Sequence, residues 1–178
     1  MSSVTSTDVL DFWFKRERKA WFEKNPQFDT EIRHRFLPLY EELALKKDWL
    51  GDPRDCLARI IVLDQFPRNM FRGSARAFAS DHLARESALV ILDKGWDKGL
   101  SADERTFAYL PFEHSESLAD QEKCCELMKP LDEEQHRYAV RHREIIARFG
   151  RFPHRNAALG RASTPEEIEF LKQPGSGF

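Results

Sequence analysis

The stretch DPRDCLARIIVLDQFPRN, residues 52–69, has both a start and a stop signal for an α-helix, and it guides the interpretation of the whole chain. Asp52 is a favourable N-cap residue, and Pro53 fits the first helical position, where an amide hydrogen is not needed. One apolar face follows at helical spacing, and it consists of Leu57, Ile60 and Ile61. Because proline cannot continue a helix, we expect this helix to end before Pro67.

Asp64 continues that apolar face by one turn, which predicts a partly buried carboxylate at the negative end of the helix dipole. Both features disfavour an unpaired charge, so Asp64 should have a cationic or hydrogen-bonding partner. His142 repeats the pattern, because it lies within an apolar stripe of a later helix that we expect to end at Phe149-Gly150. Each residue alone could simply hold the fold together. A functional role is favoured because both helices lead into a Phe-Pro sequence.

Helix signals dominate the remaining sequence, whereas the period-two alternation of strands is nearly absent. The other expected helices begin at Thr7 or Asp8, at Asp29, near Ala75, at Ser101, at Ser117, at Asp132 and at Thr164. Within them we expect a kink or a break at Pro38, a stop at Gly95 and a stop at Pro111. About eight antiparallel helices with short connections predict an all-α fold. We expect a single domain over residues 1–178, with a loose tail at 172–178 unless Phe178 docks.

Composition and charge limit the classes of partner. The chain has 28 Lys plus Arg and 30 Asp plus Glu, a net charge of -2, so no overall field attracts nucleic acid or anionic lipid. The three cysteines, Cys56, Cys124 and Cys125, contain no Cys-x-x-Cys pair, which argues against a disulfide framework and a thiolate zinc site. No signal-peptide pattern is present, and no apolar run reaches the roughly 20 residues that cross a bilayer. We therefore expect a cytoplasmic protein without a metal or a cofactor.

Two similar Phe-Pro segments, DQFPRN at 64–69 and RFGRFPHRN at 148–156, continue into arginine and asparagine. Proline biases the preceding residue toward an extended backbone, so Phe66 and Phe152 can anchor in the core. The polar residues after each proline are then held at the edge of an apolar anchor. Such segments could be structural staples whose arginines bond helix-terminal carbonyls. If they converge instead, they form a site with guanidinium and amide donors.

A third polar segment, YLPFEHSES at 109–117, crowds Glu113, His114, Ser115 and Glu116 into a short connection. A histidine flanked by carboxylates can act as an acid or base near neutral pH. We therefore interpret His114 and Glu113 as candidate catalytic residues. Ser115 and Glu116 have a simpler interpretation as the cap and first turn of the next helix.

These segments also carry a family resemblance. LDQFPRNMFRGSARAFASD, YLPFEHSESLADQE and RFGRFPHRNAALGRASTPEE resemble a bacterial family of unknown function, number 924, and the resemblance extends from VLDFWF to the last expected helix. It implies an all-α fold related to tetratricopeptide repeats (TPR), with antiparallel helix pairs stacked into a right-handed superhelix. It implies no established activity. The family's motif positions are Asp64, Gln65, Phe66, Pro67, Arg68, Asn69, Pro111, Glu113, His114, Ser115, Glu116, Arg148, Gly150, Arg151, Pro153, His154, Arg155 and Asn156.

We expect a binding module with a polar pocket for an anionic small molecule or a peptide carboxylate. Its ligand-binding residues would be Asp64, Gln65, Arg68, Asn69, Glu116, His142, Arg151, His154, Arg155 and Asn156. The alternative is a hydrolase in which His114 is the general base, Glu113 or Glu116 orients it, and arginines stabilise negative charge. Nucleic-acid binding is the least favoured function, because no recognition motif accompanies the near-neutral charge. The sequence predicts no oligomeric state.

Overall fold

The computed structural model describes residues 4–178, and every regular element in that range is a helix. The α-helical segments are α1 (Ser6–Phe14), α2 (Pro26–Leu45), α3 (Pro53–Ile60), α4 (Phe66–Met70), α5 (Asp81–Asp93), α6 (Ala102–Glu113), α7 (Leu118–Met128), α8 (Glu133–Phe149), α9 (Asn156–Leu159) and α10 (Pro165–Leu171). They are joined by one π-helical turn, η2 (Ile61–Gln65), and by the 3-10 turns η1 (Arg18–Trp21), η3 (Ala75–Ala77), η4 (Trp96–Gly99) and η5 (Pro153–Arg155). The predicted all-α class is confirmed, and the TPR-like superhelix stays a prediction.

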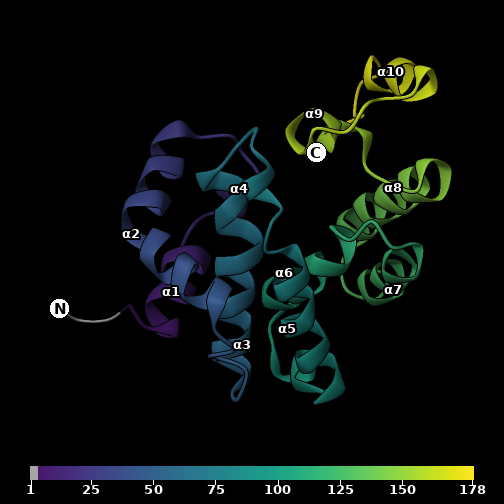
Figure 1. Cartoon of the computed structure of the whole chain (residues 1–178). Coiled ribbons are helices and arrows are strands. Elements are labelled where there is room, and N and C mark those ends of the chain that lie inside the picture. Colours follow the sequence, from purple (N-terminus) through teal and green to yellow (C-terminus); the bar gives the residue numbers. More distant parts are fainter. Residues whose placement is uncertain (1–3) are drawn as a thin grey trace.

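From α5 to α8 each helix packs against the next one along the chain, whereas in the first half α1 packs against α3 and α2 packs against α4 (Figure 1). α3 packs against α5 and α6, α6 packs against α7, and α7 packs against α8. Beyond α8 the chain turns back, so that Arg155 in η5 lies 3.7 Å from Asp81 at the start of α5. This return brings the last part of the chain to the segments that the sequence marks as a candidate site.

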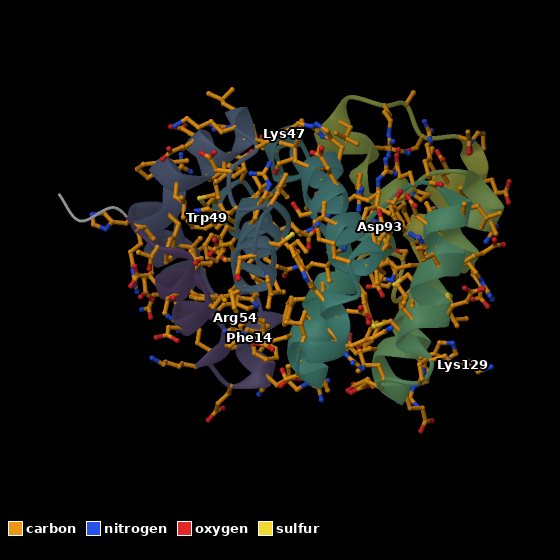
Figure 2. All side chains as sticks on the ribbon, turned by 90° about the horizontal axis from the view of Figure 1, so that it is seen from below. Phe14, Lys47, Trp49, Arg54, Asp93 and Lys129 are labelled. Carbon is orange, nitrogen blue, oxygen red and sulfur yellow. The ribbon has the colours of Figure 1, made fainter. Side chains whose placement is uncertain are left out.

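The main apolar core is continuous from α1 to α8 and is rich in aromatic rings. Phe66 is fully buried in it, with its ring centroid 4.7 Å from that of Phe36. Side chains fill the space between neighbouring helices (Figure 2). A second, small cluster holds Phe152, also fully buried, against Ile145 and Ile146. Burying such a side chain stabilises a fold by about 1.5–3 kcal/mol. Both phenylalanines therefore anchor their Phe-Pro segments in the apolar core.

The sequence predicts a helix end before Pro67, and α3 does end before it, at Ile60, but the helical path continues through η2 into α4. The turn η2 follows α3 directly, and the Phe66 amide donates to the carbonyl of Ile61, five residues back. Proline has no amide hydrogen to donate to the carbonyl of Leu63, four residues before it. The Ser80 hydroxyl donates to that carbonyl instead, at 2.6 Å. A widened turn and a donor from another segment together accommodate a proline inside a helical path.

Two further prolines also lie inside helices, so α2 has no break at Pro38, where a kink stays a prediction, and α6 does not stop at Pro111. Pro38 is within α2, and Pro111 is within α6. α6 ends two residues after its proline, where the side-chain amide of Gln121 donates to the carbonyls of Glu113 and Ser115 at 2.5 and 2.7 Å. The end of α6 is therefore set by a side chain of α7, and not by the proline.

Most of the predicted helix starts are confirmed. The capping residues of α3, α6, α8 and α10 are Asp52, Ser101, Asp132 and Thr164, as expected. The first two helices begin earlier, because Thr5 and Asn25 are the caps in place of Thr7 or Asp8 and of Asp29. Within residues 4–178, no helix has both the length and the apolar composition that crossing a membrane requires.

The tail also differs from the simplest expectation, because Phe178 does dock. Its ring stacks on the imidazole of His142 in α8, with the centroids 3.6 Å apart. Arg141 donates to the carbonyl of Gly175 at 3.2 Å. Residues of the tail are thus part of the wall around the candidate site.

Candidate functional site

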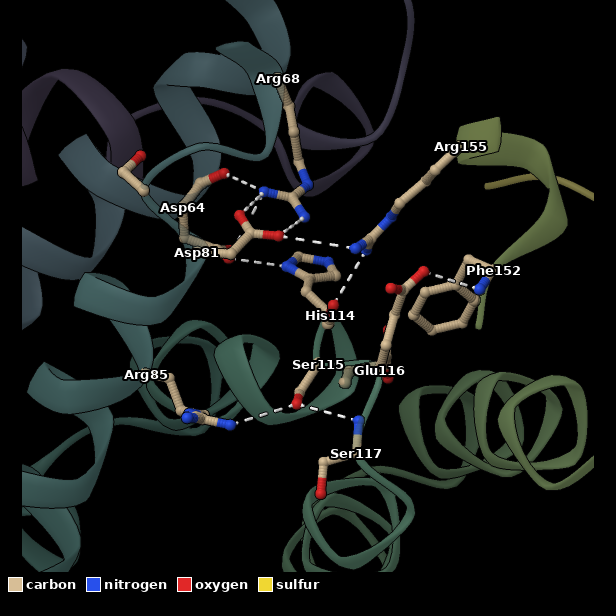
Figure 3. A network of polar contacts seen from close by, with 12 residues as sticks. Asp64, Arg68, Asp81, Arg85, His114, Ser115, Glu116, Ser117, Phe152 and Arg155 are labelled. Atoms are coloured by element: carbon tan, nitrogen blue, oxygen red, sulfur yellow. Dashed lines mark hydrogen bonds and ion pairs between the residues drawn. The ribbon is translucent and has the colours of Figure 1, made fainter. Parts of the chain in front are cut away.

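Asp64 and His114 form a hydrogen-bonded pair at the centre of the site (Figure 3). His114 Nδ1 lies 2.7 Å from Asp64 Oδ1, although 50 residues separate the two. Asp64 is fully buried in η2, and π-helical turns are frequent at functional sites. Two more groups complete its environment, since Gln65 Nε2 donates to it at 2.6 Å and Arg68 Nη1 lies 3.6 Å away. Asp64 therefore has the partners that its inward position requires.

This environment determines the charge of Asp64 and the tautomer of His114. Burial by itself raises the pKa of the Asp64 carboxyl, but His114 and Arg68 outweigh burial and lower that pKa to about 2. Burial and the nearby charge of Arg68 lower the pKa of His114. At neutral pH, His114 therefore donates its Nδ1 hydrogen to an ionised carboxylate and keeps Nε2 as a proton acceptor. This is the arrangement of a general base held in one orientation.

The two Phe-Pro segments converge at Asp81, the first residue of α5. Arg68 donates to both carboxylate oxygens of Asp81, at 2.7 and 2.9 Å. Arg155 Nη1 lies 3.7 Å from the same carboxylate, and Arg155 Nη2 donates to the backbone carbonyl of His114 at 3.0 Å. Three segments that are far apart in the sequence thus meet in one place (Figure 3).

Arg155 is the least neutralised cation of this group. Its side chain is only 8 % exposed, and its Nε has no hydrogen-bond partner in the part of the chain that the structure describes. Burial and repulsion from Arg68 lower the pKa of Arg155 to about 10, so the guanidinium stays charged at neutral pH. The neighbouring carboxylate, Asp81, already accepts two bonds from Arg68. A buried cation in this position gains stability from a further anion.

Glu113 belongs to a second buried pair, with His142 of α8. Glu113 Oε1 lies 3.5 Å from His142 Nδ1, which donates to the carbonyl of Tyr138 at 2.8 Å. Burial and, second, the charge of Asp64 raise the pKa of Glu113 to about 8, whereas burial lowers that of His142 to about 3. Both side chains are therefore mainly neutral at pH 7. The residue that orients His114 is Asp64, so Glu113 does not have the orienting role expected from the sequence.

Most of these groups line a cavity of about 890 Å³, whereas Asp64 and Asp81 are not part of its lining. Its walls come from η1 and the following loop, α4, the end of α6, α8, η5 and the tail. The predicted site residues among its lining are Gln65, Arg68, Asn69, Glu113, His114, His142, His154 and Arg155. The apolar part of the lining consists of Trp21, Phe22, Phe78, Leu110, Tyr138 and Phe178. The cavity thus joins a cationic wall to an aromatic one, which suits a molecule with both characters.

Arg151, Asn156 and Glu116 lie outside this cavity. Arg151 donates to both oxygens of Glu167 at 2.8 and 2.9 Å, and Asn156 donates to the same carboxylate at 3.1 Å. Glu116 accepts a hydrogen bond from the Phe152 amide at 2.8 Å. These contacts hold the segment after α8 against its neighbours, and a ligand-binding role for the three residues stays a prediction.

Asp81 and Phe78 belong to the site but are not among the site residues predicted from the sequence. The guanidinium groups of Arg68 and Arg155 lie 5.4 and 4.6 Å from the ring centroid of Phe78, which aligns both cations. A signal for Asp81 exists, because it is the last residue of the family segment LDQFPRNMFRGSARAFASD. Over residues 4–178, no group of three or more His, Cys, Asp or Glu side chains is placed to hold a metal ion.

Comparison with known proteins agrees with this architecture. A family model described as "Bacterial protein of unknown function (DUF924)" matches residues 9–175. A solved structure, described as a protein of unknown function, ATU0120, from Agrobacterium tumefaciens, is similar over 94 % of this chain and 96 % of that chain. The two are 42 % identical in sequence and superpose with a TM-score of 0.88. No curated protein matches the chain.

Proposed function

The chain belongs to the DUF924 family of bacterial proteins of unknown function, and from its own geometry we propose that it binds a small anionic molecule in the cavity beside His114. The ligand would carry a carboxylate or a phosphate group, since guanidinium binds both through charge-assisted hydrogen bonds. A cavity of about 890 Å³ has the size of a small-molecule site.

The observation that carries this proposal is the environment of Arg155. Arg155 and Arg68 face the same carboxylate, Asp81, which bonds to Arg68 through both oxygens. Burying a second guanidinium beside this pair costs free energy unless another negative charge compensates it. A bound anion supplies that charge.

Two exposed cations of the lining favour the same class of ligand. Lys24 and Arg141 line the cavity, and in residues 4–178 neither has an ion-pair partner within 4.0 Å. Exposed cations that line a cleft raise the local concentration of anions and speed their association.

Isothermal titration calorimetry with inorganic phosphate, acetate and 4-phenylbutyrate tests the proposal. Arg155→Met keeps the apolar length of the side chain but removes its charge. We expect at least about tenfold weaker binding, because a hydrogen bond to a charged group contributes about 1.5–3 kcal/mol. Arg148→Met is the matched control, since Arg148 is half exposed and pairs with Glu166 outside the cavity. Equal affinities in all three proteins, or no binding of any anion to the wild type, would contradict the proposal.

Acid–base catalysis on the bound anion is a second candidate function, and the Asp64–His114 pair favours it. With Nδ1 bonded to the carboxylate at 2.7 Å, Nε2 can accept a proton from water during a hydrolysis. Arg155, bonded to the His114 carbonyl, would stabilise the negative charge that develops. This version of the hydrolase hypothesis gives the orienting role to Asp64.

Hydrolysis of p-nitrophenyl phosphate, which carries the anionic group that Arg155 would bind, tests this second function. His114→Gln should lower the rate by about two orders of magnitude or more, the usual contribution of a general base. Asp64→Asn should also change the pH profile of kcat, because the tautomer of His114 is then no longer fixed. Rates that are equal in wild type and His114→Gln would exclude catalysis by this pair.

A further inference from the structure

Phe178 occupies a slot on the wall of the cavity that is built to contact an aromatic ring. Its ring stacks on the imidazole of His142, with centroids 3.6 Å apart and an interplanar angle of 20°. The ring of His154 meets it edge to face, 5.9 Å away at 77°, and the guanidinium of Arg141 lies 5.6 Å from its centroid. We call the space between His142, His154 and Arg141 the aromatic slot. It offers a stacking face, an edge and a cation to one flat ring.

Phe178 is held in the slot far less firmly than a core residue. It is 51 % exposed, whereas Phe152, whose ring meets the same His142 at 5.6 Å, is fully buried. The chain that leads to it is Gly175-Ser176-Gly177, and glycine is the residue with the greatest backbone freedom. Releasing Phe178 therefore exposes only about the half of its surface that is now buried, and it uncovers a face of His142.

The aromatic slot adjoins Arg155, whose nearest carboxylate is already bonded to Arg68. His154 and Arg155 are consecutive residues, and the Arg155 guanidinium lies 4.6 Å from the ring centroid of Phe152, which contacts His142. A molecule in which a short chain joins a ring to a carboxylate can reach the slot with one end and Arg155 with the other. Phosphate or acetate alone would leave the slot to Phe178.

We propose that the aromatic slot is a subsite for a small aromatic carboxylate, and that Phe178 fills it while the ligand is absent. This inference rests on the proposed function and narrows its ligand class. Phe178 and the ligand ring compete for the same face of His142, so the apparent affinity is reduced by the fraction of molecules in which Phe178 is docked. Removing the Phe178 ring therefore tightens the binding of aromatic carboxylates and leaves that of phosphate unchanged.

Calorimetric titration of the full chain with 4-phenylbutyrate, 4-cyclohexylbutyrate and inorganic phosphate tests the inference. Phe178→Ala should bind 4-phenylbutyrate about threefold to tenfold more tightly than the wild type. This is the change in affinity that corresponds to the loss of one competing aromatic contact. In this variant the cyclohexyl compound, which has the same charge but no flat ring, should bind more weakly than 4-phenylbutyrate. Ile168→Ala is the control, because Ile168 is a half-exposed apolar residue that does not line the cavity.

Proton NMR of His142 gives a readout that a merely structural tail would not produce. The stacked Phe178 ring should shift the His142 ring signals upfield in the wild type, Phe178→Ala should remove this shift, and 4-phenylbutyrate should restore it in the variant. Equal affinity of wild type and Phe178→Ala for 4-phenylbutyrate, or a variant whose His142 signals ignore this ligand, would overturn the inference. If phosphate still binds in an Arg155-dependent manner, the proposed function survives that result. If no anion binds to any variant, both proposals fail.

Discussion

Replacing Glu113 with glutamine should remove the pH dependence of stability that this buried carboxyl group causes. Burial and, second, the charge of Asp64 raise the pKa of Glu113 to about 8, from 4.5 for an ordinary glutamate. Between these pH values the folded chain keeps a proton that the unfolded chain releases, so the free energy of unfolding falls as the pH rises. The difference of about 3.5 between the pKa values corresponds to at most about 5 kcal/mol, at 1.36 kcal/mol per unit.

Glutamine keeps the shape of the side chain but cannot ionise. Glu113→Gln should therefore be about as stable as the wild type near pH 4.5 and more stable by a few kcal/mol near pH 9, as urea unfolding followed by circular dichroism would measure. Glu133→Gln is the matched control, because the Glu133 side chain is 88 % exposed. Its difference from the wild type should stay within about 0.5 kcal/mol over the same range. Parallel stability curves for the wild type and Glu113→Gln would show that the folded chain does not keep the Glu113 proton above pH 4.5.

Three other substitutions test the contacts that hold the site. Ser80→Ala leaves the Leu63 carbonyl without its donor and should lower the free energy of unfolding in urea by about 1–3 kcal/mol, whereas no change would show that the proline-containing helix needs no substitute donor. Gly150→Ala places a Cβ at a φ of 70° and should cost about 1–2 kcal/mol in thermal unfolding, and a neutral result would mean that the end of α8 relaxes. Asp64→Asn should cost a few kcal/mol at neutral pH, roughly 2–3, because His114 and Arg68 lower the pKa of this carboxyl from 3.8 to about 2. Because that pKa is lowered in the folded state, the loss should shrink as the pH falls from 3.8 through about 2, and a loss that persists in acid would contradict the charge assignment.

Local signals made much of the fold predictable. An N-cap such as Asp52 or Ser101 acts on amides within three residues, so the sequence contains all the information that the cap needs. The helical path through Pro67 was not predictable in this way. The hydroxyl that satisfies the Leu63 carbonyl belongs to Ser80, 17 residues away, and no local pattern marks it.

The location of the candidate site was more predictable from the sequence than the roles of its individual residues. Glu113 and His114 are consecutive at the end of a helix, where successive side chains point about 100° apart, so the two do not pair. The residue that orients His114 is Asp64 instead. The second Phe-Pro segment resembles the first in sequence, but Arg151 bonds to Glu167 in α10. Which arginine faces the cavity depends on tertiary neighbours that a motif alone does not specify.

The claim on which the account depends is that an anion binds in the cavity next to His114. Nitrogen-15 NMR of histidine-labelled protein, titrated with pH in the presence and absence of inorganic phosphate, tests it most directly. A bound anion stabilises the imidazolium form, so the pKa of His114 should rise at saturating phosphate. His34, which is exposed on α2 and does not line the cavity, should show no such change. His114 signals that ignore phosphate, or that move only as much as those of His34, would contradict the account.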